Sequence, residues 1–411
     1  MTLEKLDLYL ASFNLPCDLN SLPNSAYLVG GLVRDALLDR TKANLDLDFV
    51  LPEKAVETAR EIARKYHGGF VVLDEARQIA RVVFKQGTLD LALQEGKSLE
   101  TDLHRRDFTI NAIAYNLHEQ KLVDPLGGRA DLECGVIRMV AAANLEDDPL
   151  RLLRAYRQAA QLNFTIEETT RSTIRSLAPL LNTVAAERIQ AELNYMFLAP
   201  WGNKWLTAAV EDGLIQPWFK TINKEKLAQL TAVEEIIASL GDRDLIADAR
   251  NSELLITAKL ATLVSSEPDT AEAELTQLKY SRSQLRAVVS TVQHLPQLQT
   301  MTSLMSLREQ YFFFLDIKDV FPVLITRAIA TGVSPTITEP LIERYFNRGD
   351  RIAHPQPLVT GNDLIQQLNL KPSPAIGKLL TEIHVAYIED QISTSAEAIE
   401  FASNLISRDK G

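Results

Sequence analysis

The spacing of apolar residues changes once along this chain, near Pro149, and that change restricts the fold more than any other feature. Before it, short apolar runs that alternate with polar residues or end in glycine predict strands mixed with short helices. After it, nearly every segment carries apolar residues at helical spacing. With 411 residues, the chain is also too long for one hydrophobic core. The sequence therefore predicts an α/β domain followed by an all-helical remainder.

The α/β part is expected to form a sheet with short connections. Its predicted strands are 26–29, 45–51, 69–73, 80–84 and 88–93, and its predicted helices are 33–38 and 55–66. Residues 150–162 predict an amphipathic helix, with Asp148 as its N-cap and Pro149 as its first residue. Further helices are predicted around residues 165–181, 184–198, 225–239, 252–265, 272–297 and 302–332. The polar, proline-bearing residues 351–357 are expected to be a hinge before a last helical unit.

Composition limits the compartment and the partners. The only two cysteines, Cys17 and Cys134, lack metal-ligand spacing and favour a reducing, cytoplasmic setting. Neither a signal peptide nor an apolar run of about eighteen residues is present, so no membrane association is expected. The net charge of −11 argues mildly against a nucleic-acid partner, yet residues 151–192 hold six arginines and only four glutamates. Local positive potential can therefore exist within an acidic whole.

The strongest motif joins two glycines, an arginine and two aspartates. Asp46 and Asp48 are two residues apart on a predicted strand, so both carboxylates face the same side. Held there, they can bind two Mg²⁺ ions and serve as the catalytic carboxylates. Gly30 and Gly31 let the backbone approach a triphosphate closely, and Arg34 can pair with a phosphate. A bare pair of aspartates on an exposed strand would be the commoner interpretation, but the ordered combination favours a nucleotide site.

A second motif, residues 105–112, suits a nucleoside triphosphate. Arg106 can neutralise phosphate, while Asp107 and Asn111 can bond sugar hydroxyls. Taken alone, this segment is more simply interpreted as a charged helix start.

A third motif places aspartates before a helix that carries three arginines at i, i+3 and i+6. Capping and surface ion pairs are one interpretation of Asp148, Arg151, Arg154 and Arg157. The other is base recognition, because a carboxylate accepts from an exocyclic amine and an arginine donates to a ring nitrogen. Cytosine and adenine offer that edge, whereas guanine and uracil present the reverse polarity. The Asp148–Arg151 pair would then select CTP and ATP without a nucleic-acid template.

These residues, in this order, resemble the motifs of class II tRNA nucleotidyltransferases, the CCA-adding enzymes, and of the related bacterial poly(A) polymerases. Motif A corresponds to residues 30–35 with Asp46 and Asp48, motif B to 105–112, motif C to 124–128, motif D to 147–151 and motif E to 188–192. Five motifs in order make a specific match. Residues 357–364 and 374–380 also resemble the C-terminal region of the family.

The resemblance implies a seahorse-like molecule of four parts. They are a catalytic nucleotidyltransferase head (1–138), a helical neck that recognises the base (139–200), a helical body (201–350) and a helical tail that binds tRNA (351–411). Asp46 and Asp48 would hold the Mg²⁺ ions, and Arg154 and Arg157 would support the nucleotide. Asp90 is either a third carboxylate near the metals or a core-edge aspartate satisfied by backbone donors.

Two departures from the family pattern refine the expected activity. The first residue of motif D is Asp147 where the family usually has glutamate, although Glu146 precedes it. Asp90 and Arg105 are close in sequence, and the longer insertion that CCA- and A-adding members usually carry there is absent. Members that stop after two cytidines typically lack it. The resemblance therefore favours transfer of CMP from CTP to a tRNA 3′-hydroxyl, with a second enzyme completing the terminal A.

Several alternatives stay open from the sequence. A full CCA-adding enzyme, an A-adding enzyme that uses ATP, and a poly(A) polymerase share the same motifs. Outside the enzymes, the chain could be a degenerate nucleotide- or RNA-binding module, although the intact carboxylate pair and arginine set argue against that. The tail could present backbone amides to tRNA phosphates or simply form a helical hairpin.

Overall fold

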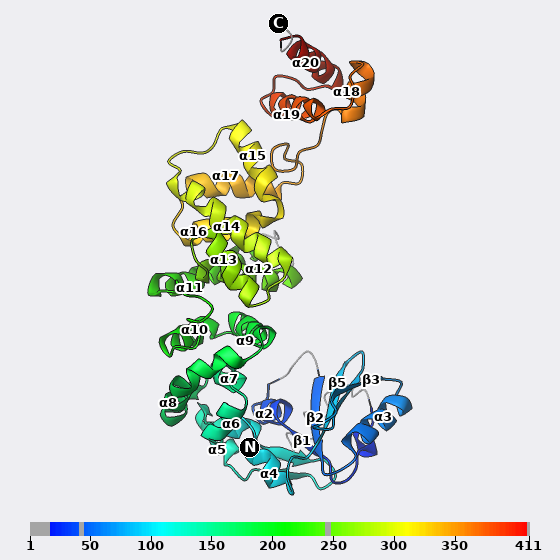
Figure 1. Ribbon diagram of the computed structural model, residues 1–411, viewed down its shortest axis with the longest axis vertical. Helices are drawn as coiled ribbons and strands as arrows, with labels where there is room; N and C mark the ends of the chain where they lie inside the picture. The colour runs from blue at the N-terminus through cyan, green and yellow to red at the C-terminus, as the bar shows by residue number, and fades with distance from the viewer. Residues whose placement is uncertain (1–16, 41–44, 243–247, 409–411) are drawn as a thin grey trace. The chain divides into compact units, whose positions relative to one another are not determined.

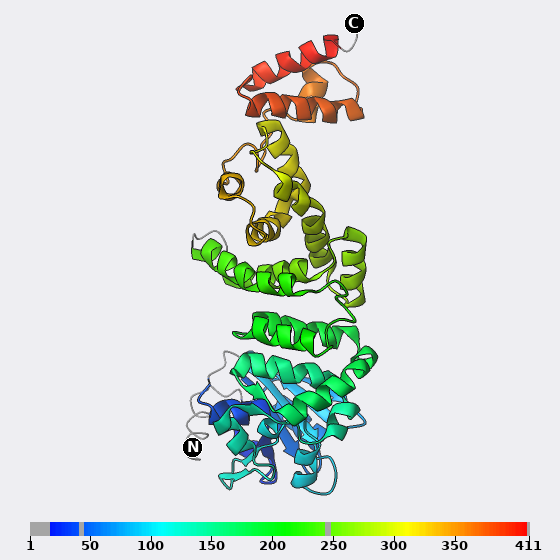
Figure 2. The same ribbon diagram turned by 90° about the vertical axis from the view of Figure 1, so that its left-hand side faces the viewer.

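The computed structural model describes residues 17–40, 45–242 and 248–408. The chain divides into two compact units, the first ending at Pro217 and the second starting at Trp218. The first unit combines a sheet with helices, and the described part of the second is helical (Figures 1 and 2). The predicted α/β architecture followed by helices is confirmed. Residues 1–16 of the predicted head and 409–411 of the predicted tail lie outside the described residues, and the division into four domains stays a prediction.

A seven-stranded mixed sheet, in the order β3-β4-β5-β2-β1-β6-β7, lies at the centre of the first unit. The strands are β1 (Tyr27–Val29), β2 (Leu45–Leu51), β3 (Gly69–Asp74), β4 (Ile79–Val83), β5 (Gly87–Leu93), β6 (Ala114–Asn116) and β7 (Lys121–Val123). β2 and β5 are parallel, and every other neighbouring pair is antiparallel. All five predicted strands are present. β6 and β7 are too short for alternation to reveal them.

Helices cover the sheet and extend from it. They are α2 (Gly31–Leu37), α3 (Ala55–Lys65), α4 (Leu99–His104), α5 (Gly128–Cys134), α6 (Ala142–Asp147), α7 (Leu150–Leu162), α8 (Glu168–Leu177), α9 (Ala186–Leu198) and α10 (Gly202–Glu211). A 3-10 turn, η2 (Thr109–Asn111), precedes β6, and a small parallel pair joins β8 (Val136–Ile137) to β9 (Thr165–Ile166). Helix α7 packs against both α9 and α10. It is amphipathic because its apolar side, including Leu152, Leu153 and Tyr156, is fully buried.

The second unit contains α11 (Lys224–Asp242), α12 (Asp248–Leu263), α13 (Pro268–Gln277), α14 (Arg282–Thr300), α15 (Leu307–Ile317), α16 (Phe321–Ala330), α17 (Pro335–Phe346), α18 (Gly361–Gln367), α19 (Pro374–Ile388) and α20 (Ser395–Arg408). One core contains stacked aromatic rings, with the Phe321 and Tyr345 centroids 4.5 Å apart. A separate core joins α18, α19 and α20 through Leu364, Ile383 and Ala398. The last three helices therefore pack around an apolar core of their own.

Several predicted helix boundaries are wrong, and local backbone chemistry explains them. The helix expected over 272–297 is two helices, because Lys279 adopts a left-handed conformation and Ser281 starts α14 with a capping box. The helix expected over 302–332 is likewise interrupted at Lys318, whose φ is 40°. The expected helix 165–181 begins with β9 instead. Asp148 does not cap α7 with its side chain, and Pro149 occupies the N-cap position.

The predicted hinge, residues 351–357, lies between α17 and α18 and has no regular secondary structure. Its first half is nevertheless held in place. Ile352 is buried, the His354 ring bonds the Tyr345 carbonyl oxygen at 2.5 Å, and the Arg351 carbonyl oxygen bonds His384 at 2.9 Å. Any hinge motion would therefore be confined to the residues after His354. None of the helices in the described part of the chain has the length and hydropathy needed to cross a bilayer.

Gly128, in motif C, stands where no side chain fits. The Asp124 carboxylate accepts hydrogen bonds from the backbone N–H groups of Gly128 (2.7 Å) and Arg129 (3.0 Å) at the start of α5. A methyl group on Gly128 would lie 2.2 Å from the Thr109 carbonyl oxygen. Because that oxygen belongs to the backbone of η2, relieving the clash would require η2 to move.

We expect Gly128→Ala to lower the free energy of unfolding by about 1–3 kcal/mol, the usual cost of overpacking. Gly377→Ala is the matched control, because Gly377 lies inside α19 and a methyl group there would meet nothing within 4 Å. The control should be neutral or slightly stabilising, since alanine loses less backbone entropy in a helix. Thermal melting followed by circular dichroism measures both variants. Equal melting temperatures would contradict the steric explanation.

Candidate active site

Strand β2 carries the two predicted catalytic carboxylates. Asp46 and Asp48 project from the same face, because Leu47 and Phe49 alternate with them and are buried in the core. The parallel neighbour β5 places Thr88 beside Asp46 and Asp90 beside Asp48. The Thr88 hydroxyl donates to Asp46 Oδ1 at 2.8 Å. The buried Leu47 and Phe49 and the pairing with β5 therefore fix the backbone from which both aspartate side chains project.

The Asp48 carboxylate lies near two other carboxylates, those of Asp90 and Asp46. Burial raises its pKa to about 6, Asp90 and Asp46 add to that rise, and Arg106 and Arg81 oppose it only in part. A carboxylate with a raised pKa lacks cationic or hydrogen-bonding compensation. A hard divalent cation would supply it, because Mg²⁺ prefers carboxylate oxygen ligands. The charge distribution at Asp48 thus fits a bound metal ion.

Asp90 is not available as a simple third ligand. Arg81 on β4 donates to both of its carboxylate oxygens, each at 2.7 Å. The sequence left open whether Asp90 joins the metals or is satisfied by backbone donors, and the structure pairs it with a side chain instead. Among the described residues, no three His, Cys, Asp or Glu side chains are grouped so as to hold a metal ion. Two carboxylates suffice for Mg²⁺ when substrate phosphates and water complete the coordination.

The glycine turn before α2 lies directly beside the carboxylates. Gly30 has φ of 74°, a left-handed conformation that glycine adopts without strain, and Gly31 begins the helix. A methyl group on Gly30 would lie 3.6 Å from Arg106 Nη1 and 3.8 Å from Asp48 Oδ2. Gly30 of motif A and Arg106 of motif B, 76 positions apart in sequence, therefore meet at this turn. Gly30 itself is buried and Gly31 is half-buried.

Arg106 combines an ion pair with an unused donor. Its Nη2 donates to Asp102 at 3.1 Å, while its buried Nε has no hydrogen-bond partner within the protein. Asn144, on α6, donates to the carbonyl oxygens of Arg106 (2.8 Å) and His104 (2.7 Å). The backbone of motif B is therefore attached to the segment that leads into α7.

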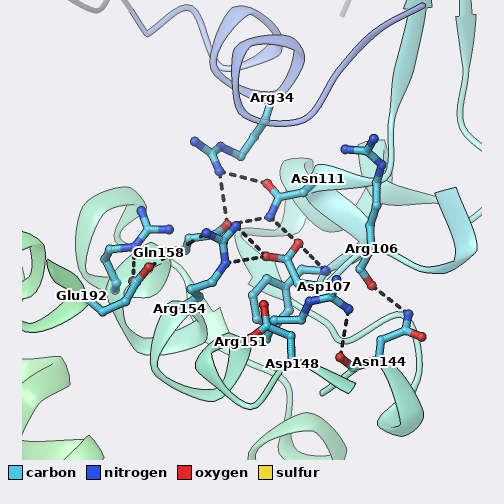
Figure 3. Close-up of polar contacts among 12 residues, drawn as sticks. Arg34, Arg106, Asp107, Asn111, Asn144, Asp148, Arg151, Arg154, Gln158 and Glu192 are labelled. Carbon is cyan, nitrogen blue, oxygen red and sulfur yellow. Dashed lines mark hydrogen bonds and ion pairs between the residues drawn. The ribbon is translucent and has the colours of Figure 1, made fainter. Parts of the chain in front are cut away.

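Arg34 lies inside the protein rather than on the rim of the site. Its side chain is only 9% exposed, and Nε and Nη2 donate to Asp35 at 2.9 and 2.8 Å. Nη1 donates to Asn111 Oδ1 at 2.9 Å and to Gln158 Oε1 at 3.2 Å (Figure 3). Most of the guanidinium donors are thus occupied. The expected pairing of Arg34 with a substrate phosphate is at odds with this geometry, which suits an internal support.

Asp107, which is buried, and Arg154, which is half-buried, form an ion pair that joins the motif B segment to α7. Asp107 Oδ2 accepts from Nε (3.0 Å) and Nη2 (2.9 Å) of Arg154, and Oδ1 accepts from Asn111 Nδ2 at 2.9 Å (Figure 3). Burial by itself would raise the pKa of Asp107, but Arg154, Asn111 and the Phe108 N–H outweigh it and lower the pKa to about 2. Asp107 and Asn111, which the sequence assigned to the sugar, are engaged with protein partners.

The expected base-reading pair is not joined in the structure. Arg151 Nη1 donates to the carbonyl oxygens of Arg105 (3.0 Å) and Asn144 (2.8 Å). Asp148 Oδ2 accepts from Arg188 Nη2 at 3.0 Å. Asp148 and Arg151 therefore each bond a partner other than the other. Asp147 is exposed at the end of α6.

Motif E lies on α9 and contacts Arg157 of α7 and Asp148 of motif D. Glu192 Oε2 accepts from Arg157 Nε at 2.5 Å, and Arg157 Nη1 also donates to Gln161 at 2.8 Å. Burial lowers the pKa of Arg157 despite the carboxylate. Because Arg188 and Glu192 are four residues apart, they share one face of α9 and hold Asp148 and Arg157 respectively. Motif E therefore holds Asp148, just before α7, and Arg157, in the middle of α7.

Sequence reasoning missed three residues of this site, Asp102, Asn144 and Gln158. Asp102 and Asn144 precede motifs B and D and look like ordinary helix residues. Gln158 carried one available signal, because it is polar on the side of α7 that is otherwise apolar. Their partners come from distant segments, so local pattern alone does not identify them.

Comparison with known families agrees with this geometry. The Poly A polymerase head domain matches residues 26–138, the probable RNA and SrmB-binding site of polymerase A matches 163–226, and a tRNA nucleotidyltransferase domain 2 matches 249–402. Two solved CCA-adding enzymes share the fold. One, in complex with CTP, has a TM-score of 0.73 and 24% identity over 94% of this chain and 91% of that one. The other, from Thermotoga maritima with tRNA, has a TM-score of 0.69 and 23% identity over 93% and 91%.

Two relatives in sequence are CC-adding tRNA nucleotidyltransferases. The Geobacter sulfurreducens protein is 46% identical over 177 residues, which is 43% of this chain and 41% of the relative. The Synechocystis protein is 51% identical over 400 residues, covering 95% of this chain and 96% of the relative. A match of that identity over nearly the full length of both chains shows that this enzyme belongs to the class II tRNA nucleotidyltransferases of the CC-adding type.

Proposed function

We propose that this protein transfers CMP from CTP to the 3′-hydroxyl of tRNA, releases pyrophosphate and stops after two cytidines. The observation that supports this most is the meeting of Asp46 and Asp48 with the glycine turn and Arg106. Carboxylates for metal, backbone for phosphate and a cationic side chain with a free donor are what nucleotidyl transfer requires. The relative from Synechocystis supports CC addition as the specific activity.

Asp46 and Asp48 would hold two Mg²⁺ ions, which when bound lower the pKa of the attacking hydroxyl and neutralise the leaving pyrophosphate. Gly30 and Gly31 would let the triphosphate approach the backbone, and Arg106 would donate to a phosphate through Nη1, which lies beside the Gly30 turn. These groups orient the reactants, and the metal site supplies the electrostatic stabilisation.

Base selection would fall to Asp148, at the end of α6, and Arg151, in the first turn of α7. Arg188 holds Asp148 through Oδ2 and two carbonyl oxygens hold Arg151 through Nη1, so the base edge would be read by the other carboxylate oxygen and the other guanidinium donors, or after these contacts exchange. Arg154 and Arg157 would support the nucleotide site through Asp107 and Glu192. Arg34, Asp107 and Asn111 would act as supports of the site, consistent with their burial.

Termination after two cytidines is supported by the short connection after β5. Only residues 94–98 separate β5 from α4, and they are tied down. The Gln94 N–H donates to the Leu51 carbonyl oxygen at 2.7 Å, and the Glu95 N–H donates to Asp102 at 3.1 Å. Ser98 caps α4 by accepting from the Thr101 N–H. No spare length remains there to reshape the pocket for adenine, so a second enzyme would complete the terminal A.

Three RNA ends separate this function from its alternatives. Purified protein is offered tRNA lacking CCA, tRNA ending in CC, and an unrelated RNA, each with CTP or with ATP. We expect two cytidines on the first substrate and no incorporation of ATP on the second. Adenosine added to the CC end would contradict CC specificity, and long adenosine tracts on the unrelated RNA would indicate a poly(A) polymerase. Absence of any incorporation would favour the non-enzymatic binding module.

A further inference from the structure

Gln158 lies where three elements of the first unit converge. It is in the middle of α7 and 1% exposed. Its Oε1 accepts from Arg34 Nη1 on α2 at 3.2 Å and from Asn111 Nδ2 on η2 at 3.0 Å (Figure 3). One amide oxygen therefore joins the helix after the glycine turn, the end of motif B and the helix of motif D.

The orientation of this amide is settled by its neighbours. Two donors face the same atom, so that atom must be the oxygen and the nitrogen must point elsewhere. The nitrogen, Nε2, is buried and has no hydrogen-bond partner within the protein. Burying an unsatisfied polar group costs free energy, and an apolar residue would match the rest of this face of α7. What holds the polar side chain on this face is therefore the pair of hydrogen bonds that its oxygen accepts from Arg34 and Asn111.

The groups on either side of Gln158 belong to opposite halves of the nucleotide site. Arg34 is four residues after Gly30, and its backbone N–H donates to the Gly30 carbonyl oxygen at 3.2 Å. Asn111 also donates to Asp107, whose other oxygen holds Arg154. Gln158 thus lies between the turn that borders the metal carboxylates and the helix that carries the base-reading residues. It touches neither the carboxylates nor the base-reading side chains themselves.

We propose that Gln158 is a positioning residue that sets the glycine turn of α2 against α7, and so sets which base is accepted when the triphosphate is bound. The proposal rests on the function proposed above. If the amide oxygen is lost, Arg34 keeps Asp35 and Asn111 but loses its direct link to α7. The elements that hold the triphosphate and the base of CTP would then be less rigidly fixed relative to each other. We expect this to lower the selectivity for CTP over other triphosphates more than it lowers folding stability.

Two variants of nearly equal size test this. Gln158→Met keeps the length of the side chain and removes the acceptor, whereas Gln158→Glu keeps an acceptor toward both donors. For each, kcat and KM are measured with CTP and with UTP on tRNA lacking CCA, together with thermal melting. We expect Gln158→Met to lower kcat for CTP and the CTP-to-UTP ratio of kcat/KM, each on the order of tenfold, since a charge-assisted hydrogen bond is lost. Gln158→Glu should recover most of the lost discrimination.

A matched control separates positioning from general destabilisation. Gln310 on α15 in the second unit is also 1% exposed and, like Gln158, has one buried amide atom without a partner. Gln310→Met should lower the melting temperature and leave the CTP-to-UTP ratio unchanged. The proposal is overturned if Gln158→Met keeps wild-type discrimination, whatever its melting temperature, or if Gln158→Glu is as indiscriminate as Gln158→Met. Failure of the wild-type protein to add CMP would instead refute the proposed function itself.

Discussion

Replacing Asp48 by asparagine should lower the rate of CMP addition by roughly a thousandfold or more, because it removes one of two carboxylates expected to hold the metal ions. The fold should survive the change. Burial and the neighbouring aspartates raise the pKa of Asp48 to about 6, so its charge is unfavourable in the metal-free protein. The neutral amide relieves that repulsion, and we expect a melting temperature in chelator that equals or exceeds the wild-type value.

The control for Asp48→Asn is the same change at Asp74, which ends β3 of the same sheet and accepts from the Arg77 N–H at 3.0 Å. Asp74→Asn should leave CMP addition close to wild type. Single-turnover incorporation of labelled CTP at saturating Mg²⁺ gives the comparison. A rate for Asp48→Asn within tenfold of wild type would remove the basis for placing metal ions on β2.

The second large effect is expected on stability, at the ion pair between Asp107 and Arg154. Asp107→Asn removes the nearest counter-charge of Arg154, leaving Glu192 at 3.9 Å, and should lower the free energy of unfolding by about 2–3 kcal/mol. The pH dependence follows from the lowered pKa of Asp107, about 2 in the fold against 3.8 ordinarily. The unfolded chain binds the proton first as the pH falls, so this contribution is complete above about pH 4 and disappears toward pH 2.

Urea unfolding of wild type and Asp107→Asn between pH 7 and pH 3 measures this contribution. The difference between the two proteins should shrink as the pH approaches 3. Asp390→Asn provides the contrast, because Asp390 is 76% exposed and pairs with Arg351 at the surface. Such pairs contribute little, so no measurable change is expected there. A pH-independent difference for Asp107→Asn would show that the carboxylate charge is not what stabilises this junction.

Much of the first unit was predictable from local pattern. The alternation of Leu45–Leu51 predicted β2 with the bounds that the structure has, and with them the shared face of Asp46 and Asp48. Helix α7 was equally predictable, because its apolar residues recur at helical spacing from Leu150 to Leu162. These elements are long and strongly periodic, so their own sequences determine them.

The partners of the site residues were not predictable in the same way. Asp148 looked like a helix cap and a base reader, yet its carboxylate bonds Arg188, forty residues later. Arg34 looked like a phosphate ligand, yet Asn111 and Gln158 surround it. A guanidinium has five donors, and tertiary packing decides which acceptors reach them. The spacing of motifs therefore identifies the residues of the site and leaves their mutual contacts undetermined.

The strand that bears the carboxylates also bears part of the core, and this affects how the enzyme can change over time. Leu47 and Phe49 are buried on one side of β2 while Asp46 and Asp48 project from the other. A change of volume at either apolar position would tilt the same backbone that aims the carboxylates. Drift in the hydrophobic interior should therefore appear first as weakened metal affinity and only later as unfolding. The interior behind β2 therefore supports the direction of the carboxylates as well as the stability of the fold.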